Sequence, residues 1–181
     1  MSLKTLISIE AYEALTEPGG ERYELSEGEL VVTPASSLYH NKIRDRIGFR
    51  LGAYVQKHGL GDVAMETDFK LASNTVRRPD VAFVTAERLK NVDPRTSPLG
   101  TKPDLAIEVQ SPHDDLPRKL SDYLAANVPV WVIYPDSQIA RIFRPVAKPQ
   151  LLDAVKGDVL EDAALLPGFR LPLAEILAEQ T

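Results

Sequence analysis

The sequence contains no cysteine, and this absence excludes several kinds of site at once. Its 181 residues include no Cys, so a disulfide framework, a thiolate zinc site, an iron–sulfur cluster and a cysteine nucleophile are all excluded. Histidine is also scarce, and no two of the three histidines are four residues apart, as a helical metal motif would require. The chain has no P-loop, no Gly-x-Gly-x-x-Gly and no Gly-x-Ser-x-Gly, which argues against nucleotide-driven and serine-hydrolase chemistry.

Long hydrophobic runs are missing as well. The longest apolar run, residues 128–134, is interrupted by Pro129 and is far shorter than the roughly 20 residues that cross a membrane as a helix. The first ten residues lack the apolar region of a signal peptide. We therefore expect a cytoplasmic protein without a membrane segment.

Neither sign of charge dominates strongly. The formal net charge is −5, which argues against a general polyanion-binding protein. Positive residues outnumber negative ones only within residues 37–150, so a local surface for phosphate groups remains possible, although most single charges are expected to lie on solvated helix faces. The length and a hydrophobic content of 44% predict one globular domain, residues 1–181.

Hydrophobic periodicity predicts an α/β fold. Apolar residues recur every four positions from Ile43 to Val55, which predicts a long helix that begins after Ser36 or Ser37 and ends at residues 58–59. A short helix after Ser8 and a hairpin of strands 22–25 and 29–33 are expected before it.

The remaining predicted elements are strands interrupted by short helices. We expect strands at residues 62–66, 68–72, 80–84, 104–110, 130–134 and 139–143. A turn is predicted at 73–75, a helical turn at 86–90, a loop at 91–103, and a helix that is capped by Asp114 or Asp115 and stops at Asn127. The tail is expected to add a strand or two and a helix near 173–177. This order indicates a mixed β-sheet flanked by helices, with a core of about residues 20–145.

Two carboxylates interrupt strands that are otherwise apolar. Asp80 precedes the run Val-Ala-Phe-Val, and Glu108 lies inside Leu-Ala-Ile-Glu-Val. A buried carboxylate is costly unless it is paired, hydrogen-bonded or bound to a metal. Acids on neighbouring strands can hold one hard cation such as Mg²⁺, and Lys119 begins the following helix. The alternatives are a turn-capping role for Asp80 and a metal-free salt bridge between Glu108 and Lys119.

Several short motifs follow one another in a characteristic order. They are Tyr23-Glu24-Leu25-Ser26-Glu27-Gly28-Glu29-Leu30, His40 at the start of a helix, Pro79-Asp80-Val81, Ile107-Glu108-Val109-Gln110-Ser111-Pro112, and Lys119 with Tyr123. Together they resemble the Uma2 family (DUF820), restriction-endonuclease-like proteins of the PD-(D/E)XK nuclease superfamily. The resemblance covers about residues 8–145. It implies a restriction-endonuclease-like core and hydrolysis of phosphodiester bonds with Mg²⁺, for which Mn²⁺ can substitute.

The resemblance also implies roles for individual residues. Asp80 and Glu108 would be the metal ligands, and Lys119 would position or activate the water. The superfamily often has lysine two residues after the second acid, where this chain has Gln110, which cannot carry a proton away. Four residues are expected to support the site, namely Glu24 as an outer ligand or hydrogen-bond partner, His40 as a holder of water or phosphate, Gln110 and Tyr123.

The expected partner is nucleic acid, and DNA in particular. Six basic residues are candidates for gripping flanking phosphates: Arg44, Arg50, Arg77, Arg78, Lys102 and Arg118. A homodimer is expected, because cutting both strands of a duplex needs two active sites. Asp114 is expected to act only as a helix cap. The alternative functions are a catalytically inactive module that binds nucleic acid or a protein partner, and a phosphoesterase acting on a small substrate.

Overall fold

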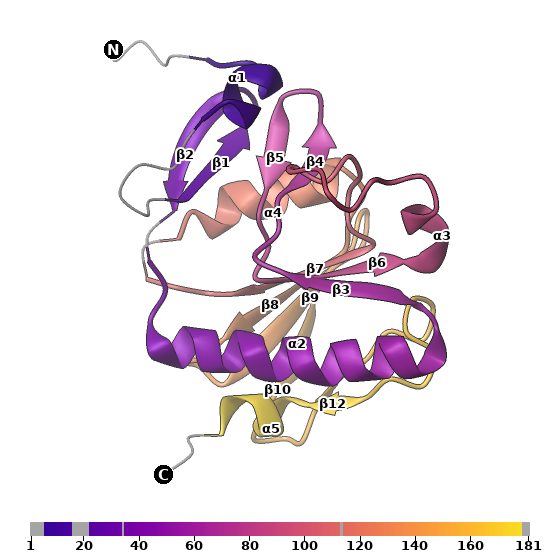
Figure 1. Ribbon diagram of the computed structural model, residues 1–181. Helices are drawn as coiled ribbons and strands as arrows, with labels where there is room; N and C mark the ends of the chain where they lie inside the picture. Colours follow the sequence, from indigo (N-terminus) through magenta and orange to yellow (C-terminus); the bar gives the residue numbers. More distant parts are fainter. Residues whose placement is uncertain (1–5, 16–21, 34, 113, 179–181) are drawn as a thin grey trace.

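A six-stranded mixed sheet forms the centre of the molecule (Figure 1). The computed structural model describes residues 6–15, 22–33, 35–112 and 114–178. The strand order is β10-β9-β8-β7-β6-β3, and only β7 and β8 pair in parallel. The strands are β3 (Gly61–Met65), β6 (Val81–Thr85), β7 (Leu105–Val109), β8 (Val130–Tyr134), β9 (Ile139–Phe143) and β10 (Gln150–Asp153).

The long helix α2 (Leu38–His58) covers one face of this sheet (Figure 1). Its first turn is capped by Ser37, whose Oγ accepts the His40 N–H at 3.1 Å. The helix ends at Gly59, which adopts a left-handed φ of 63°. The predicted apolar stripe from Ile43 to Val55 is buried in the largest hydrophobic cluster. Both predicted ends and the buried face of this helix are therefore confirmed.

The C-terminal segment packs on the same side of the sheet. It comprises β11 (Val159–Leu160), β12 (Leu171–Pro172) and α5 (Leu173–Leu177), and α5 contacts α2. Arg46 of α2 donates to the Ile176 carbonyl at 2.8 Å. The largest hydrophobic cluster includes residues of this segment up to Leu177.

The helix α4 (Leu116–Ala125) covers the opposite face and connects the parallel strands β7 and β8. Alternate residues of a strand point to opposite faces. Accordingly, Leu105, Ile107 and Val109 pack in the cluster with α2. Ala106 packs in the cluster with α4, and Glu108 falls on this same face.

A second, four-stranded sheet of order β2-β1-β5-β4 lies beside α4 (Figure 1). It consists of β1 (Arg22–Ser26), β2 (Glu29–Thr33), β4 (Phe69–Ala72) and β5 (Thr75–Arg77), and α1 (Ile9–Glu13) packs on it. The predicted hairpin is confirmed, since Glu27 and Gly28 both have positive φ, 51° and 82°, as a tight two-residue turn requires.

Most of the other predicted elements are also confirmed. The exception is β5, which begins at Thr75, where a turn was expected. The short helix at 86–90 is α3 (Ala86–Leu89), and Ser8 caps α1 as expected. His113 lies outside the described residues. In the part of the chain that the structure describes, no helix has the length and apolar character needed to span a membrane.

Candidate functional site

Glu108 is buried in the middle of β7, and only 1% of its surface is exposed. Both of its carboxylate oxygens bond to α4. The Lys119 ammonium donates to Oε2 at 3.1 Å, and the Tyr123 hydroxyl donates to Oε1 at 2.8 Å. Lys119 and Tyr123 are four residues apart and therefore share one face of the helix. The structure thus brings together the mid-strand acid and both helical residues predicted to accompany it.

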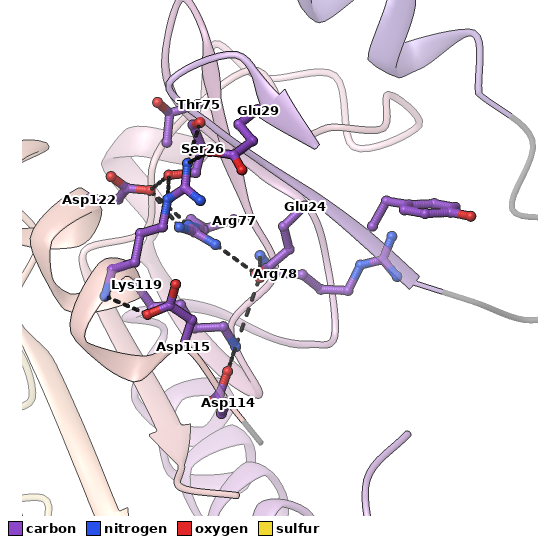
Figure 2. A network of polar contacts seen from close by, with 12 residues as sticks. Glu24, Ser26, Glu29, Thr75, Arg77, Arg78, Asp114, Asp115, Lys119 and Asp122 are labelled. Carbon is purple, nitrogen blue, oxygen red and sulfur yellow. Dashed lines mark hydrogen bonds and ion pairs between the residues drawn. The ribbon is translucent and has the colours of Figure 1, made fainter. Parts of the chain in front are cut away.

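Lys119 is surrounded by three carboxylates. Its Nζ lies 3.1 Å from Glu108, 3.4 Å from Asp114 and 4.0 Å from Glu24. Figure 2 shows the ammonium between Glu24 and Asp114. The lysine is itself buried, with 7% of its side chain exposed. It is thus fixed in a negatively charged environment.

The prediction that Asp114 only caps the helix is wrong. Asp115 is the cap, and its Oδ1 accepts the Arg118 N–H at 3.4 Å. Asp114 instead points at Lys119 and joins the cluster of acids. The sequence offered no signal to separate the two, because either of two adjacent aspartates before a helix can supply the cap.

Asp80 lies directly before β6, on the strand neighbouring β7. The antiparallel register pairs Val81 with Ile107, so one further step along both strands brings the backbone of Asp80 next to that of Glu108, and the charge of Asp80 raises the pKa of Glu108. Asp80 Oδ2 accepts the Val109 N–H at 2.7 Å and lies 3.2 Å from Nε2 of His40 on α2. Burial opposes a charge on His40, but the bond to Asp80 and its charge outweigh burial and raise the pKa of the histidine.

The cluster holds more carboxylates than cations. Burial and, to a smaller extent, the charges of Asp80, Glu24 and Asp114 raise the pKa of Glu108, the Lys119 charge lowers it, and the net result is a pKa of about 8. Burial likewise raises the pKa of Asp114. Burial lowers the pKa of Lys119, but its acidic neighbours outweigh this effect and raise it. The lysine therefore stays protonated, while Glu108 and Asp114 resist ionisation beside the other acids, a cost that a divalent cation bound there would offset.

Glu24 is held by arginine. The Arg77 guanidinium donates to Glu24 Oε2 at 2.8 Å, the Arg78 N–H donates to Oε1 at 2.8 Å, and Arg77 also lies 2.7 Å from Asp122 (Figure 2). Of the two roles expected for Glu24, the contacts match the hydrogen-bond partner. The expectation that Arg77 grips phosphate is wrong, because its side chain is only 1% exposed. Asp122 was not identified from the sequence.

The other predicted residues lie in varied surroundings. Gln110 Nε2 donates to the neighbouring Ser111 carbonyl at 3.0 Å, and no bond between Gln110 and the acids is found in the described part of the chain. The remaining basic candidates have intramolecular partners: Arg44 with Asp45 and Glu66, Arg50 with Glu175, Arg78 with Asp68, Lys102 with the Ala126 carbonyl, and Arg118 with Ser26 and Glu29.

A metal held by three or more protein side chains does not fit these residues. Among the described residues, no group of three or more His, Cys, Asp or Glu side chains is arranged to hold a metal ion. Magnesium, however, usually takes one or two carboxylates and completes its shell with water and substrate phosphate. Asp80, whose carboxylate bonds to the Val109 N–H, and the neighbouring Glu108 supply two carboxylates whose charges act on each other. The residues therefore fit a two-carboxylate magnesium site.

Comparisons with known proteins agree with this fold. A crystal structure of a "putative nuclease belonging to DUF820" from Anabaena variabilis is similar, with a TM-score of 0.81 and 17% identity over 94% of this chain and 97% of that chain. At this identity the likeness shows the fold alone. No match was found among curated proteins. The sequence model of the Uma2 family, described as "Putative restriction endonuclease", matches residues 9–174. The mixed α/β chain with its acid-rich site therefore belongs to the Uma2 family.

Proposed function

We propose that this protein is a metal-dependent endonuclease that hydrolyses phosphodiester bonds in DNA, with Mg²⁺ as its cofactor and Mn²⁺ as a substitute. One observation carries the proposal. Glu108, buried in the middle of a strand, contacts Lys119, and the Asp80 carboxylate bonds to the N–H of Val109, the next residue of the same strand. Two acids and a cation at one point match what phosphodiester hydrolysis requires, namely a metal site and a positive charge beside the phosphate.

Asp80 and Glu108 would hold the ion. When bound there, Mg²⁺ supplies polarisation of a phosphoryl oxygen and a lower pKa for the attacking water. His40 positions Asp80 through its bond to Oδ2, and Tyr123 positions Glu108 through its bond to Oε1. Hydrogen bonds of this kind orient ligating carboxylates and are commonly as important as the ligands.

Lys119 acts as a fixed positive charge in this mechanism. Because its carboxylate neighbours raise its pKa, it keeps its proton and does not serve as a general base. Its ammonium can orient the water by hydrogen bonding and offset charge that develops on the phosphate. Glu24, held by Arg77, lies 4.0 Å from the ammonium and helps to keep it in place.

Nicking of supercoiled plasmid DNA tests the proposal. We expect the wild type to nick the plasmid with Mg²⁺ or Mn²⁺ and to stop when EDTA is added. Glu108→Gln should remove cleavage, since it removes a metal-binding charge and keeps the side-chain shape. Glu87→Gln is a matched control at an exposed glutamate, 80% accessible, on α3. Equal nicking by Glu108→Gln and wild type would refute the proposal.

A second candidate function is a catalytically inactive nuclease-fold module that binds nucleic acid or a protein partner. It is favoured by Gln110, which stands where the superfamily often has lysine, and by the three carboxylates that hold Lys119. Titration calorimetry with Mg²⁺ separates the two. Binding at millimolar metal that is lost in Asp80→Asn supports the nuclease, whereas no binding supports the inactive module.

We also propose that the protein is cytoplasmic and that it is a homodimer. The dimer is proposed because two sites are needed to cut both strands of a duplex. Sedimentation velocity of the full chain, alone and with duplex DNA, measures this directly. A protein that stays monomeric with DNA and only nicks one strand would contradict the dimer and leave the hydrolytic site unaffected.

A further inference from the structure

We propose that Arg22 and Arg44 form a binding site for a backbone phosphate next to Asp80, and that the carboxylate of Glu66 occupies this site when nucleic acid is absent. The inference rests on the proposed function, because it assigns the contact that holds the substrate strand beside the reacting phosphate. It gives Glu66 the role of a competitor for the substrate.

Two guanidinium groups from distant parts of the chain converge on one carboxylate oxygen. Arg22 at the start of β1 has its Nη1 2.5 Å from Glu66 Oε1, and Nη1 of Arg44 on α2 bonds to the same oxygen. Glu66 directly follows β3. Arg44 also contacts its neighbour Asp45 at 2.8 Å. Three separate elements thus meet at a carboxylate that both arginines share.

This cluster lies beside the proposed metal site. The Glu66 N–H donates to the Asp80 carbonyl at 3.3 Å. Arg44 lies one helical turn after His40, which contacts the Asp80 carboxylate, so both side chains leave the same face of α2. Although burial lowers the pKa of Arg44, its acidic neighbours, Asp80 among them, raise it. A phosphate bound by Arg44 would therefore neighbour one bound at Asp80.

The chemistry of the cluster suits exchange with phosphate. Arginine binds carboxylate and phosphate oxygens with the same planar fork of donors. A phosphodiester carries one negative charge, as the Glu66 carboxylate does, so replacing one by the other preserves the charge balance. Solvent reaches all three groups, with 41% of the Arg22 side chain, 24% of Glu66 and 15% of Arg44 exposed. The buried Arg77, 1% exposed, has no such access.

The backbone of Glu66 is in an unfavourable conformation. Its φ is 49°, in the left-handed region that residues other than glycine seldom adopt. Such strain persists only where the surroundings over-determine it, and it clusters at ligand-binding sites. The strained residue, Glu66, is also the one whose N–H bonds to Asp80 and whose carboxylate contacts the two arginines. This supports a carboxylate placed where a ligand binds.

Binding without cleavage tests the inference separately from the hydrolase. The probe is a fluorescent 20-base-pair duplex, and its anisotropy is measured with the full chain in Ca²⁺ at several salt concentrations. We expect Arg44→Ala to weaken binding about tenfold and to reduce the salt slope by about one. Glu66→Gln should tighten binding, because it removes the competing charge. Arg170→Ala, at an arginine that is 67% exposed and paired with Glu161, should change little.

Thermal melting of each variant checks that the fold is kept. If Arg44→Ala is unstable, Arg44→Lys replaces it; because lysine retains the charge, this variant should bind more tightly than Arg44→Ala and less tightly than wild type. The inference is overturned if Arg44→Ala binds like Arg170→Ala, if Glu66→Gln weakens binding as Arg44→Ala does, or if the wild type does not bind the duplex at low salt. Loss of nicking in Glu108→Gln is a separate outcome, so a failed phosphate site and a failed hydrolase are distinguishable.

Discussion

Replacing Glu108 by glutamine should stabilise the protein at high pH while removing the proposed nuclease activity. Glutamine keeps the shape of the side chain and can still bond to the Lys119 ammonium and the Tyr123 hydroxyl, which contact the two carboxylate oxygens. What it loses is a negative charge buried among other acids. The substitution therefore isolates the energetic cost of ionising Glu108 inside the fold.

The size of the effect follows from the pKa of Glu108. Its ordinary value is 4.5, and burial raises it to about 8 in the fold. Because the folded pKa is the higher of the two, the stability that this group contributes is fully present below pH 4.5 and is lost as the pH rises through about 8. At about 1.4 kcal/mol per pKa unit, the loss reaches up to about 5 kcal/mol.

Urea unfolding between pH 5 and pH 9 measures this difference, with the fluorescence of Trp131, the single tryptophan, as the signal. Glu108→Gln and wild type should have similar free energies of unfolding at pH 5, and the variant should become progressively more stable than wild type towards pH 9. The exposed control Glu87→Gln should follow the wild type throughout. Parallel curves for Glu108→Gln and wild type, or a variant that is less stable at pH 9, would refute the reasoning.

Two further substitutions test the surroundings of the site. Arg77→Met should lower the free energy of unfolding by about 3–5 kcal/mol in urea titrations, because Glu24 and Asp122 would lose the guanidinium that pairs with both of them; an unchanged stability would contradict this account. Asp115→Ala should lower the free energy of unfolding by about 1 kcal/mol, because the helix loses its cap. Asp114→Asn should leave the cap intact and reduce the pH dependence of unfolding. The reverse pattern would show that Asp114 is the cap.

The fold was largely predictable because its strongest signals are local. The stripe from Ile43 to Val55 repeats at helical spacing, and Gly28 marks the hairpin turn because glycine adopts positive φ readily. Strand β5 was missed, since three residues are too few to show a period. Its pairing with β1 through Leu25 and Val76 joins positions far apart in the sequence, and no local pattern records such a contact.

The site was predictable only in part, for the same reason. Glu108 stood out because a charge in an apolar strand needs a partner, and the spacing of Lys119 and Tyr123 places both on one face. Arg77 gave no comparable signal. The local sequence around a basic residue does not show whether its side chain is exposed or buried. Arg77 is buried because it pairs with Glu24 and Asp122, and these two acids come close to it only in the folded chain.

The two faces of the central sheet have different tasks. The face towards α4 carries Glu108 and its partners, whereas the C-terminal segment of β11, β12 and α5 packs with α2 on the other face through apolar contacts. Mutations in this C-terminal segment should therefore lower solubility and yield at a level of change that still leaves the acid cluster unaffected. A protein engineer could repack it, or fuse another domain to it, while the acid cluster on the far side of the sheet is left as it is.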